Sequence, residues 1–215
     1  MLVMRRSRRE AGDTLIEVLF AVSVFSLAVV GSLMLMNQGT ATSTRSLQIT
    51  LVRQQIDNQA ETLRFLSAAY VANYYTGYSP DLTDPATSPS EEYFKILKAV
   101  KARQAAGQTS VSSFGSGDTT CATAPTSSFV LNSQMATYQA YDASKMLEAN
   151  TFSQVLYDGG GALTSTQGLW IESVRATPSS GASYVDYHIR ACWYPPGTGQ
   201  PMNLGTIVRL YEPTS

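Results

Sequence analysis

Residues that carry most enzymatic chemistry are almost missing from this chain. Its 215 residues include one histidine, His188, and two cysteines, Cys121 and Cys192. A single histidine on the polar side of a predicted strand, with no cluster of cysteines or acids around it, makes neither a metal site nor a catalytic base. We therefore expect a protein that is not an enzyme and that has no metal ion and no cofactor.

Charged residues are also scarce, at 14% of the chain, and the formal net charge is −1. Nucleic-acid-binding domains are typically basic or carry a basic stripe, so we infer no nucleic-acid binding. The run Asp158-Gly159-Gly160-Gly161 lacks the lysine of a phosphate-binding loop and is predicted to be a turn. Asp81 and Asp84 lie in a proline-rich loop, where two acids are far more often solvated than bound to calcium.

One hydrophobic run, by contrast, is long. No charged residue occurs at positions 18–36, which is about the length that a helix needs to cross a bilayer. Glu17 lies at the entrance of this run, where a carboxylate is costly and is a functional candidate. The positive-inside rule predicts a cytoplasmic N-terminus, because four arginines precede the run: Arg5, Arg6, Arg8 and Arg9.

A cleavable secretory signal explains this run poorly. Such a signal has a shorter apolar core, of roughly 7–15 residues, followed by a small-x-small cleavage site. Residues 37–41 match such a site poorly. A plain signal-anchor helix that keeps its N-terminus remains an alternative.

The sequence Gly12-Asp13-Thr14-Leu15-Ile16-Glu17-Val18, after the basic leader, resembles the class III signal of type IV pilins and pseudopilins. The resemblance implies that prepilin peptidase cuts between Gly12 and Asp13 on the cytoplasmic side. Residues 1–12 would be removed as a leader, and the apolar helix would stay with the mature protein.

The resemblance also gives Glu17 a role in subunit assembly. In the family, this glutamate pairs with the amino terminus of a neighbouring subunit in the filament. A buried carboxylate without a partner is expensive, and an incoming ammonium group removes most of that penalty. The pairing would therefore set the stagger between subunits. The alternative is a glutamate that is solvated at the lipid interface.

The chain departs from the family at Asp13. The family usually begins its mature chain with phenylalanine, whose amine is N-methylated by the same peptidase. The carboxylate of Asp13 would compete with Glu17 for the amine, so methylation of Asp13 is uncertain. Minor pilins and pseudopilins vary more at this position than the major subunit, so the change favours a minor subunit.

The cysteines and the charge fit an exported domain. Loss of the leader would leave 11 basic and 15 acidic residues, a formal charge of −4. In an exported domain the default for two cysteines is one disulfide, here between Cys121 and Cys192. It would close a loop of about seventy residues, worth about 4 kcal/mol in the chain-entropy model. Two free thiols in a buried core are the alternative.

A single long helix is predicted from Thr14 to about Tyr75, on the order of 60 residues and 90 Å. Its second half is amphipathic. The expected apolar stripe is Leu47, Ile49, Val52, Ile56, Ala60, Leu63, Leu66 and Tyr70, opposite Arg45, Arg53, Gln54, Asp57, Glu61 and Arg64. Two helices broken near Gly31-Ser32 or at Gly39 are the alternative, since the usual proline kink of the family is missing.

The predicted organisation is a leader (1–12), an assembly helix in the membrane (13–40), an amphipathic half-helix (41–75) and a head (76–215). Within the head, Ser88-Pro89-Ser90-Glu91 predicts a capped helix that ends at Gly107. Strands are expected at 129–131 and 152–157, and a helical segment at 135–147. Three β-rich runs at 169–176, 184–194 and 204–211 predict an antiparallel meander. The fold class is α+β: a long N-terminal helix packed on an antiparallel C-terminal β-sheet, as in pilins.

The middle run of the meander alternates. Its apolar set should face the long helix: Val185, Tyr187, Ile189, Ala191 and Trp193. Cys192 would then point outward, so that the disulfide would hold the Cys121 loop over the exposed face of the sheet. Tyr74, Tyr75 and Tyr78 are expected to complete, with Tyr70, the packing of the helix on the head.

The resemblance implies a minor subunit of a type IV pilus, held in the cytoplasmic membrane by one helix with its head outside and later drawn into a surface filament. Its expected partners are prepilin peptidase, other pilin subunits, the membrane assembly platform and the lipid bilayer. A pseudopilin of a type II secretion system would share residues 1–40. A signal-anchored surface binding module that never polymerises is the alternative from a different class.

Overall fold

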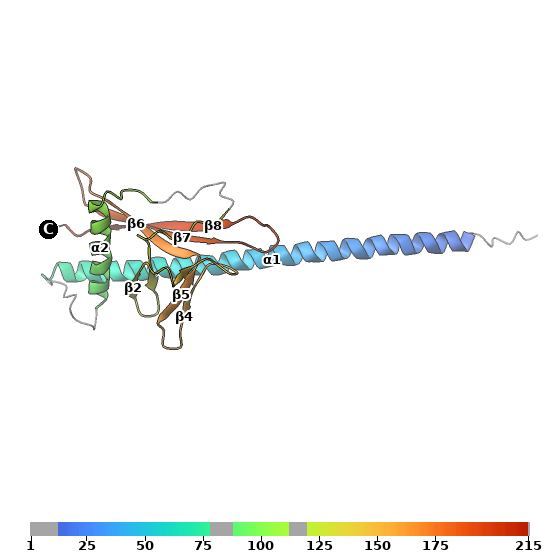
Figure 1. The fold of residues 1–215 in the computed structure, drawn as a ribbon, viewed down its shortest axis with the longest axis horizontal. Coiled ribbons are helices and arrows are strands. Elements are labelled where there is room, and N and C mark those ends of the chain that lie inside the picture. The colour runs from blue at the N-terminus through green and yellow to red at the C-terminus, as the bar shows by residue number, and fades with distance from the viewer. Residues whose placement is uncertain (1–12, 78–87, 112–119, 215) are drawn as a thin grey trace, which may run out of the picture. The chain divides into compact units, whose positions relative to one another are not determined.

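The computed structural model describes residues 13–77, 88–111 and 120–214. These residues form two helices, α1 (Asp13–Tyr74) and α2 (Pro89–Ala105), and eight strands (Figure 1). The strands are β1 (Phe129–Asn132), β2 (Thr137–Ala140), β3 (Met146–Leu147), β4 (Gln154–Tyr157), β5 (Leu163–Gln167), β6 (Leu169–Ala176), β7 (Tyr184–Trp193) and β8 (Met202–Tyr211). The chain divides into two compact units, Met1–Thr44 and Arg45–Ser215, and α1 contributes to both. The class is α+β, as predicted.

The prediction of one long helix is confirmed, because α1 runs for 62 residues. It passes through Gly31 and Gly39 without interruption, so the alternative of two helices is not found. Neither glycine is needed for a close contact, since a Cβ atom at either position would meet nothing within 4 Å.

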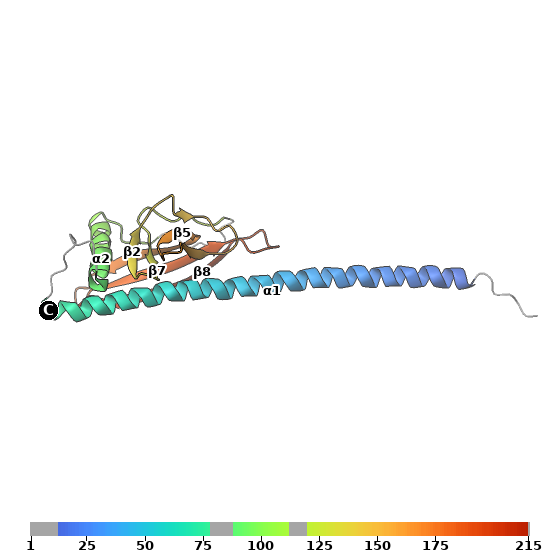
Figure 2. The ribbon, with the colours of Figure 1, turned by 90° about the horizontal axis from the view of Figure 1, so that it is seen from below.

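Residues 45–74 of α1 pack along one face of the larger sheet (Figure 2). The predicted stripe is buried over most of its length: Val52, Ile56, Ala60, Leu63, Leu66 and Tyr70. The prediction that Leu47 belongs to the buried stripe is wrong, because its side chain is 60% exposed. At 100° per residue, Leu47 lies about 160° around the helix from Ile49, away from the stripe. The buried neighbour of Ile49 on the sheet side is Gln48.

Two glutamines of α1 bind the head by hydrogen bonds. Gln59, which is 1% exposed, donates to the carbonyl of Leu131 (2.7 Å) and accepts from its N–H (2.8 Å). Nearer the start of this segment, Gln48 accepts from the indole of Trp193 (3.2 Å) and donates to the Thr151 carbonyl (3.4 Å). Polar side chains thus fix the position of a helix whose other sheet-facing residues are mostly apolar.

The larger sheet has the order β2-β1-β6-β7-β8, and all its neighbours are antiparallel. Strands β6, β7 and β8 form the predicted meander. The apolar set of β7 is 0% exposed throughout, which confirms its predicted face: Val185, Tyr187, Ile189, Ala191 and Trp193. Strand β1 meets β6 only at Phe129 and Ile171, and beyond that point Gln59 pairs with the backbone of Leu131.

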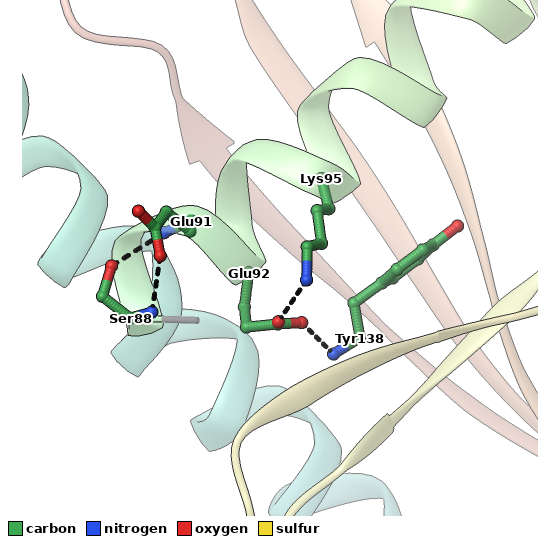
Figure 3. A network of polar contacts seen from close by, with 5 residues as sticks. All are labelled: Ser88, Glu91, Glu92, Lys95 and Tyr138. Atoms are coloured by element: carbon green, nitrogen blue, oxygen red, sulfur yellow. Dashed lines mark hydrogen bonds and ion pairs between the residues drawn. The ribbon is translucent and has the colours of Figure 1, made fainter. Parts of the chain in front are cut away.

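Helix α2 confirms the predicted cap and closes one edge of the larger sheet (Figure 3). The Ser88 hydroxyl accepts from the Glu91 N–H, and the Glu91 carboxylate accepts from the Ser88 N–H (2.7 Å). One turn on, Glu92 accepts from the backbone N–H of Tyr138 in β2 (2.7 Å) and pairs with Lys95 (2.7 Å). The carboxylate thus occupies an N–H on the outer edge of β2.

The prediction of a helical segment at 135–147 is wrong, because this segment holds β2 and β3. Its alanines, methionines, glutamine and lysine favour a helix locally. Asn132, however, accepts from the N–H groups of Gln134 and Met135, and this turn folds β2 back onto β1. Tertiary pairing therefore overrides the local preference.

A smaller sheet of order β3-β5-β4 lies beside the first one in the chain's second unit. Strand β4 begins at Gln154, two residues after the predicted start at position 152. Strand β5 was not predicted, since its sequence Leu-Thr-Ser-Thr-Gln carries one apolar residue. The prediction that Asp158–Gly161 form a turn is confirmed. They connect β4 to β5, and Asp158 accepts hydrogen bonds from the N–H groups of Gly160 and Ala162 (both 2.9 Å).

Replacement of Gln59 tests how α1 is held on the sheet. Gln59→Ala should lower the free energy of unfolding by about 2–4 kcal/mol, because it leaves the buried N–H and C=O of Leu131 without their partners. Urea unfolding followed by the fluorescence of the buried Trp170 and Trp193 measures this change. Gln54→Ala, on the exposed side of the same helix, is the matched control and should stay within about 0.5 kcal/mol of the wild type. Equal effects of the two substitutions would contradict the role given to Gln59.

Candidate assembly site and the disulfide-bonded face

The first unit presents an apolar helix surface without a protein cover. From Leu15 to Met36 its large apolar side chains are 41–74% exposed. By length and composition, the helix of the described residues that contains them could cross a membrane, which indicates a single-pass anchor near the N-terminus. Burial of so much apolar surface requires lipid or other helices, because water solvates it poorly.

The hydroxyl groups in this run are satisfied inside the helix. Ser23, Ser26 and Ser32 each donate to the carbonyl four residues earlier, at 2.7–2.8 Å. Such internal hydrogen bonds remove the cost of placing a hydroxyl where no water is available. The run is therefore apolar in effect over its whole circumference.

Glu17 is the acid at the start of this surface, and its side chain is exposed. It lies four residues, or about one turn, after Asp13, where α1 begins. Among the described residues, no hydrogen bond or ion pair to Glu17 is found. Of the predicted cleavage site, the structure describes Asp13 only, because Gly12 lies outside the described residues.

In the second unit, Cys121 and Cys192 form the predicted disulfide, with their Cα atoms 5.6 Å apart. The loop of Cys121 is also held by its N–H, which donates to the hydroxyl of Tyr194 (2.9 Å). Cys192 is 1% exposed, and residues 121–124 line a small cavity together with Trp170 and Cys192, so the Cys121 loop covers this part of the sheet. Cys192 does alternate with the helix-facing set, as predicted, and residues on its side of the sheet are covered as well.

A charge pair is buried on this same face. Arg190 on β7 and Glu172 on β6 are diagonal neighbours, since Arg190 lies opposite Trp170 and Glu172 lies opposite His188. Their charged groups are 3.4 Å apart, and the two residues are 7% and 1% exposed. The Trp170 indole donates to the same Glu172 oxygen (3.0 Å). Burial lowers the pKa of Arg190, and the charge of Glu172 acts in the opposite direction. A buried pair of this kind favours one arrangement of the strands, since breaking it would leave a charge without compensation.

His188 lies beside this pair on β7 and is partly buried. Burial is the main cause that lowers the pKa of His188, and the charge of Arg190 adds to it. Asp186 and Glu172 act in the opposite direction. Among the described residues, no group of three or more His, Cys, Asp or Glu could hold a metal ion.

The tyrosines at the end of the stripe differ in how far they pack against the head. Tyr70 packs against Tyr93 (5.5 Å between ring centroids) and Phe94 (6.3 Å), as expected for the end of the packed segment. Tyr74 contacts Tyr70 at 6.2 Å, but Tyr75 is 66% exposed and does not take part in the core. Tyr78, Asp81 and Asp84 lie outside the described residues.

Comparison of the chain with protein-family models, with curated proteins and with solved structures finds no match among any of them.

The titration of His188 predicts how stability depends on pH. Because the folded-state pKa lies below the ordinary value of about 6.5, the unfolded chain takes up the proton first as the pH falls. The contribution of the neutral imidazole to the free energy of unfolding is therefore fully present above about pH 6.5. It is lost as the pH falls through the folded-state pKa.

The urea midpoint should accordingly decrease between about pH 7 and pH 5, and His188→Gln should reduce this decrease. Carboxylates such as Asp186 and Glu212, whose pKa values are lowered by Arg209 and Arg175, lose their contribution at lower pH in both proteins. An unchanged pH dependence in His188→Gln would show that the imidazole has no such effect.

Proposed function

We propose that this chain is a minor subunit of a type IV pilus, inserted in the cytoplasmic membrane, processed by prepilin peptidase and assembled through its N-terminal helix. The observation that carries the proposal is the exposed apolar surface from Leu15 to Met36 with a single carboxylate, Glu17, at its entrance. An anchor alone requires only the apolar surface. A role as an anchor gives no reason for an acid at position 17, where burial of a carboxylate is costly.

Cleavage after Gly12 would supply a partner for that acid. The free α-amino group of Asp13 would carry a positive charge through most of the physiological range, with a pKa of roughly 7.7–8.0. It would lie about one helical turn from Glu17 of its own chain. A neighbouring subunit shifted along the bundle could bring its amino group to the same carboxylate. The charge pair would then favour one stagger among the many that apolar packing allows.

The start at Asp13 supports a minor rather than a major subunit. A second carboxylate beside the amino group competes with Glu17 for the same charge, so the contact between subunits should be weaker. A subunit present in few copies tolerates this better than one that forms the whole filament. On this proposal the protein has no enzymatic activity, and its partners are prepilin peptidase, other pilin subunits, the assembly platform and lipid.

The processing step gives the first test of the proposal. Intact mass and N-terminal sequencing of the protein from membranes should show a chain that begins at Asp13 when the cognate peptidase is present and at Met1 when it is absent. Gly12→Leu is the matched control, because it should block processing and leave the apolar helix unchanged. A chain that begins at Met1 in the presence of the peptidase would leave a simple anchored domain and overturn the proposal.

The assembly step gives the second test. Glu17→Ala should be cleaved normally and should lose at least about tenfold in the ratio of sheared filament to membrane protein, since a tenfold change corresponds to only about 1.4 kcal/mol. Ser23→Ala, in the same run, removes a hydroxyl bonded within its own helix and should assemble normally. Glu17→Gln separates the charge from the shape of the side chain and should behave like Glu17→Ala. Wild-type levels of Glu17→Ala in filaments would contradict the role of the charge pair.

A further inference from the structure

The two edges of the larger sheet differ. At the β2 edge, helix α2 supplies Glu92, whose carboxylate accepts the N–H of Tyr138 (2.7 Å). Strand β8 forms the other edge, and no described strand pairs with its outer side. With ten residues, β8 is as long as β7 and much longer than β2. A long open edge presents a row of backbone hydrogen-bonding groups to any extended chain nearby.

The hydrogen-bond pattern shows which groups face outward. The Cys192 N–H donates to the Gly168 carbonyl, so the backbone of Cys192 points toward β6. The next residue, Ala191, then points toward β8 and its partner Leu204, because these directions alternate along a strand. The backbone groups of β8 that face away from β7 therefore belong to Asn203, Gly205, Ile207, Arg209 and Tyr211.

Strand β8 also lacks the usual protection of an edge. It contains no proline and no lysine, and its one charged residue is Arg209. The guanidinium of Arg209 is neutralised within the sheet by two hydrogen bonds to Asp186 (both 2.7 Å) and lies 4.0 Å from the centre of the Tyr184 ring. Ile207 and Tyr211, on the same face, are each 60% exposed. An exposed tyrosine and isoleucine beside an arginine whose charge is already paired favour binding to another protein over solvation.

A second copy of this chain does not fit this edge. Two β8 strands that pair antiparallel are related by a two-fold axis perpendicular to the sheet. That axis would reverse the direction of residues 45–74 of α1, which lie along the sheet (Figure 2). The N-terminal ends of these two segments would then point in opposite directions, although each continues along the chain into an apolar run that needs lipid or other helices. Head-to-tail pairing with β2 of another copy meets α2 and the Glu92 contact instead (Figure 3).

We propose that the open edge of β8 binds an extended, uncharged segment of a different protein, which adds to the sheet as a further strand. Its backbone would bond to the outward groups of Gly205, Ile207 and Arg209. Its side chains would alternate between Ile207 and Tyr211 on one face and the half-buried Leu204 and Leu210 on the other. Apolar or β-branched residues match both faces. A charged segment would find no opposite charge, because Arg209 is already paired with Asp186. This inference goes beyond the proposed pilus function and does not depend on it.

Amide hydrogen exchange of the full chain in lipid nanodiscs tests the edge itself. In the free protein, the outward N–H groups of Gly205, Ile207 and Arg209 should exchange at least about tenfold faster than those of Thr206 and Val208, which point toward β7. The probe for binding is an acetylated and amidated peptide of nine alternating threonine and valine residues. At about 1 mM it should slow the outward amides at least about tenfold. The same peptide with N-methyl groups on alternate residues should have no effect, because it cannot donate the hydrogen bonds.

The matched variants are Ile207→Pro and Ile207→Ala. Ile207→Pro removes an outward N–H, which costs no hydrogen bond inside the sheet, and should abolish peptide binding while the head stays folded. Ile207→Ala keeps that N–H and should reduce binding less. If Ile207→Pro does not fold, the N-methylated peptide still decides between backbone pairing and side-chain contact alone.

Three results would overturn the proposal. The first is slow exchange of the outward amides in the free protein, which would mean that the edge is already covered. The second is a lack of protection by the peptide at about 1 mM, or equal protection by its N-methylated form. The third is a dimer in sedimentation experiments that Ile207→Pro abolishes, which would mean that a second copy occupies the edge.

Discussion

The hydrogen bonds between Gln59 and the backbone of Leu131 answer a constraint that acts on the whole head. A peptide group removed from water needs a partner, and the divergence of β1 from β6 would leave Leu131 without one. The Gln59 amide presents an N–H donor and a carbonyl acceptor to the backbone of Leu131, as a neighbouring strand would, so Gln59 replaces the missing strand. The long helix is thereby attached to the sheet through the sheet's own bonding pattern, in addition to apolar contact.

The same constraint explains other parts of the molecule. In the apolar run, serine hydroxyls bond to carbonyls of their own helix, so that no group requires water. At the β2 edge, a carboxylate of α2 accepts a strand N–H. On the covered face of β6 and β7, Glu172 receives both an indole N–H and a guanidinium. In each of these places a polar group has its partner within the protein, both inside regular elements and at their edges.

Periodicity and turn chemistry made much of this fold predictable. The apolar spacing of α1, the Ser88–Glu91 cap and the alternation of β7 are local signals, and each agrees with the structure. Residues 135–147 and β5 escaped prediction because their conformation depends on partners far along the chain. The disulfide was expected to hold the Cys121 loop over the face of Cys192, but the nearly complete burial of that face depends on tertiary packing that no local pattern shows. For the candidate site, Glu17 was identifiable because a charge beside an apolar run is visible in the sequence, whereas the open edge of β8 required the strand order.

The position of the disulfide has a consequence for the order of events during the export that the proposed function requires. Cys121 and Cys192 are 71 residues apart, with β1 to β6 and nearly all of β7 between them. In the proposed topology the N-terminus stays in the cytoplasm and the head crosses the membrane in the order of its sequence, so Cys121 emerges long before its partner. The bond can therefore close only when most of the head is outside. Because Cys192 ends up almost fully covered, an oxidant must reach it before the packing of that face is complete. The time available for oxidation is thus set by the rate at which the head folds.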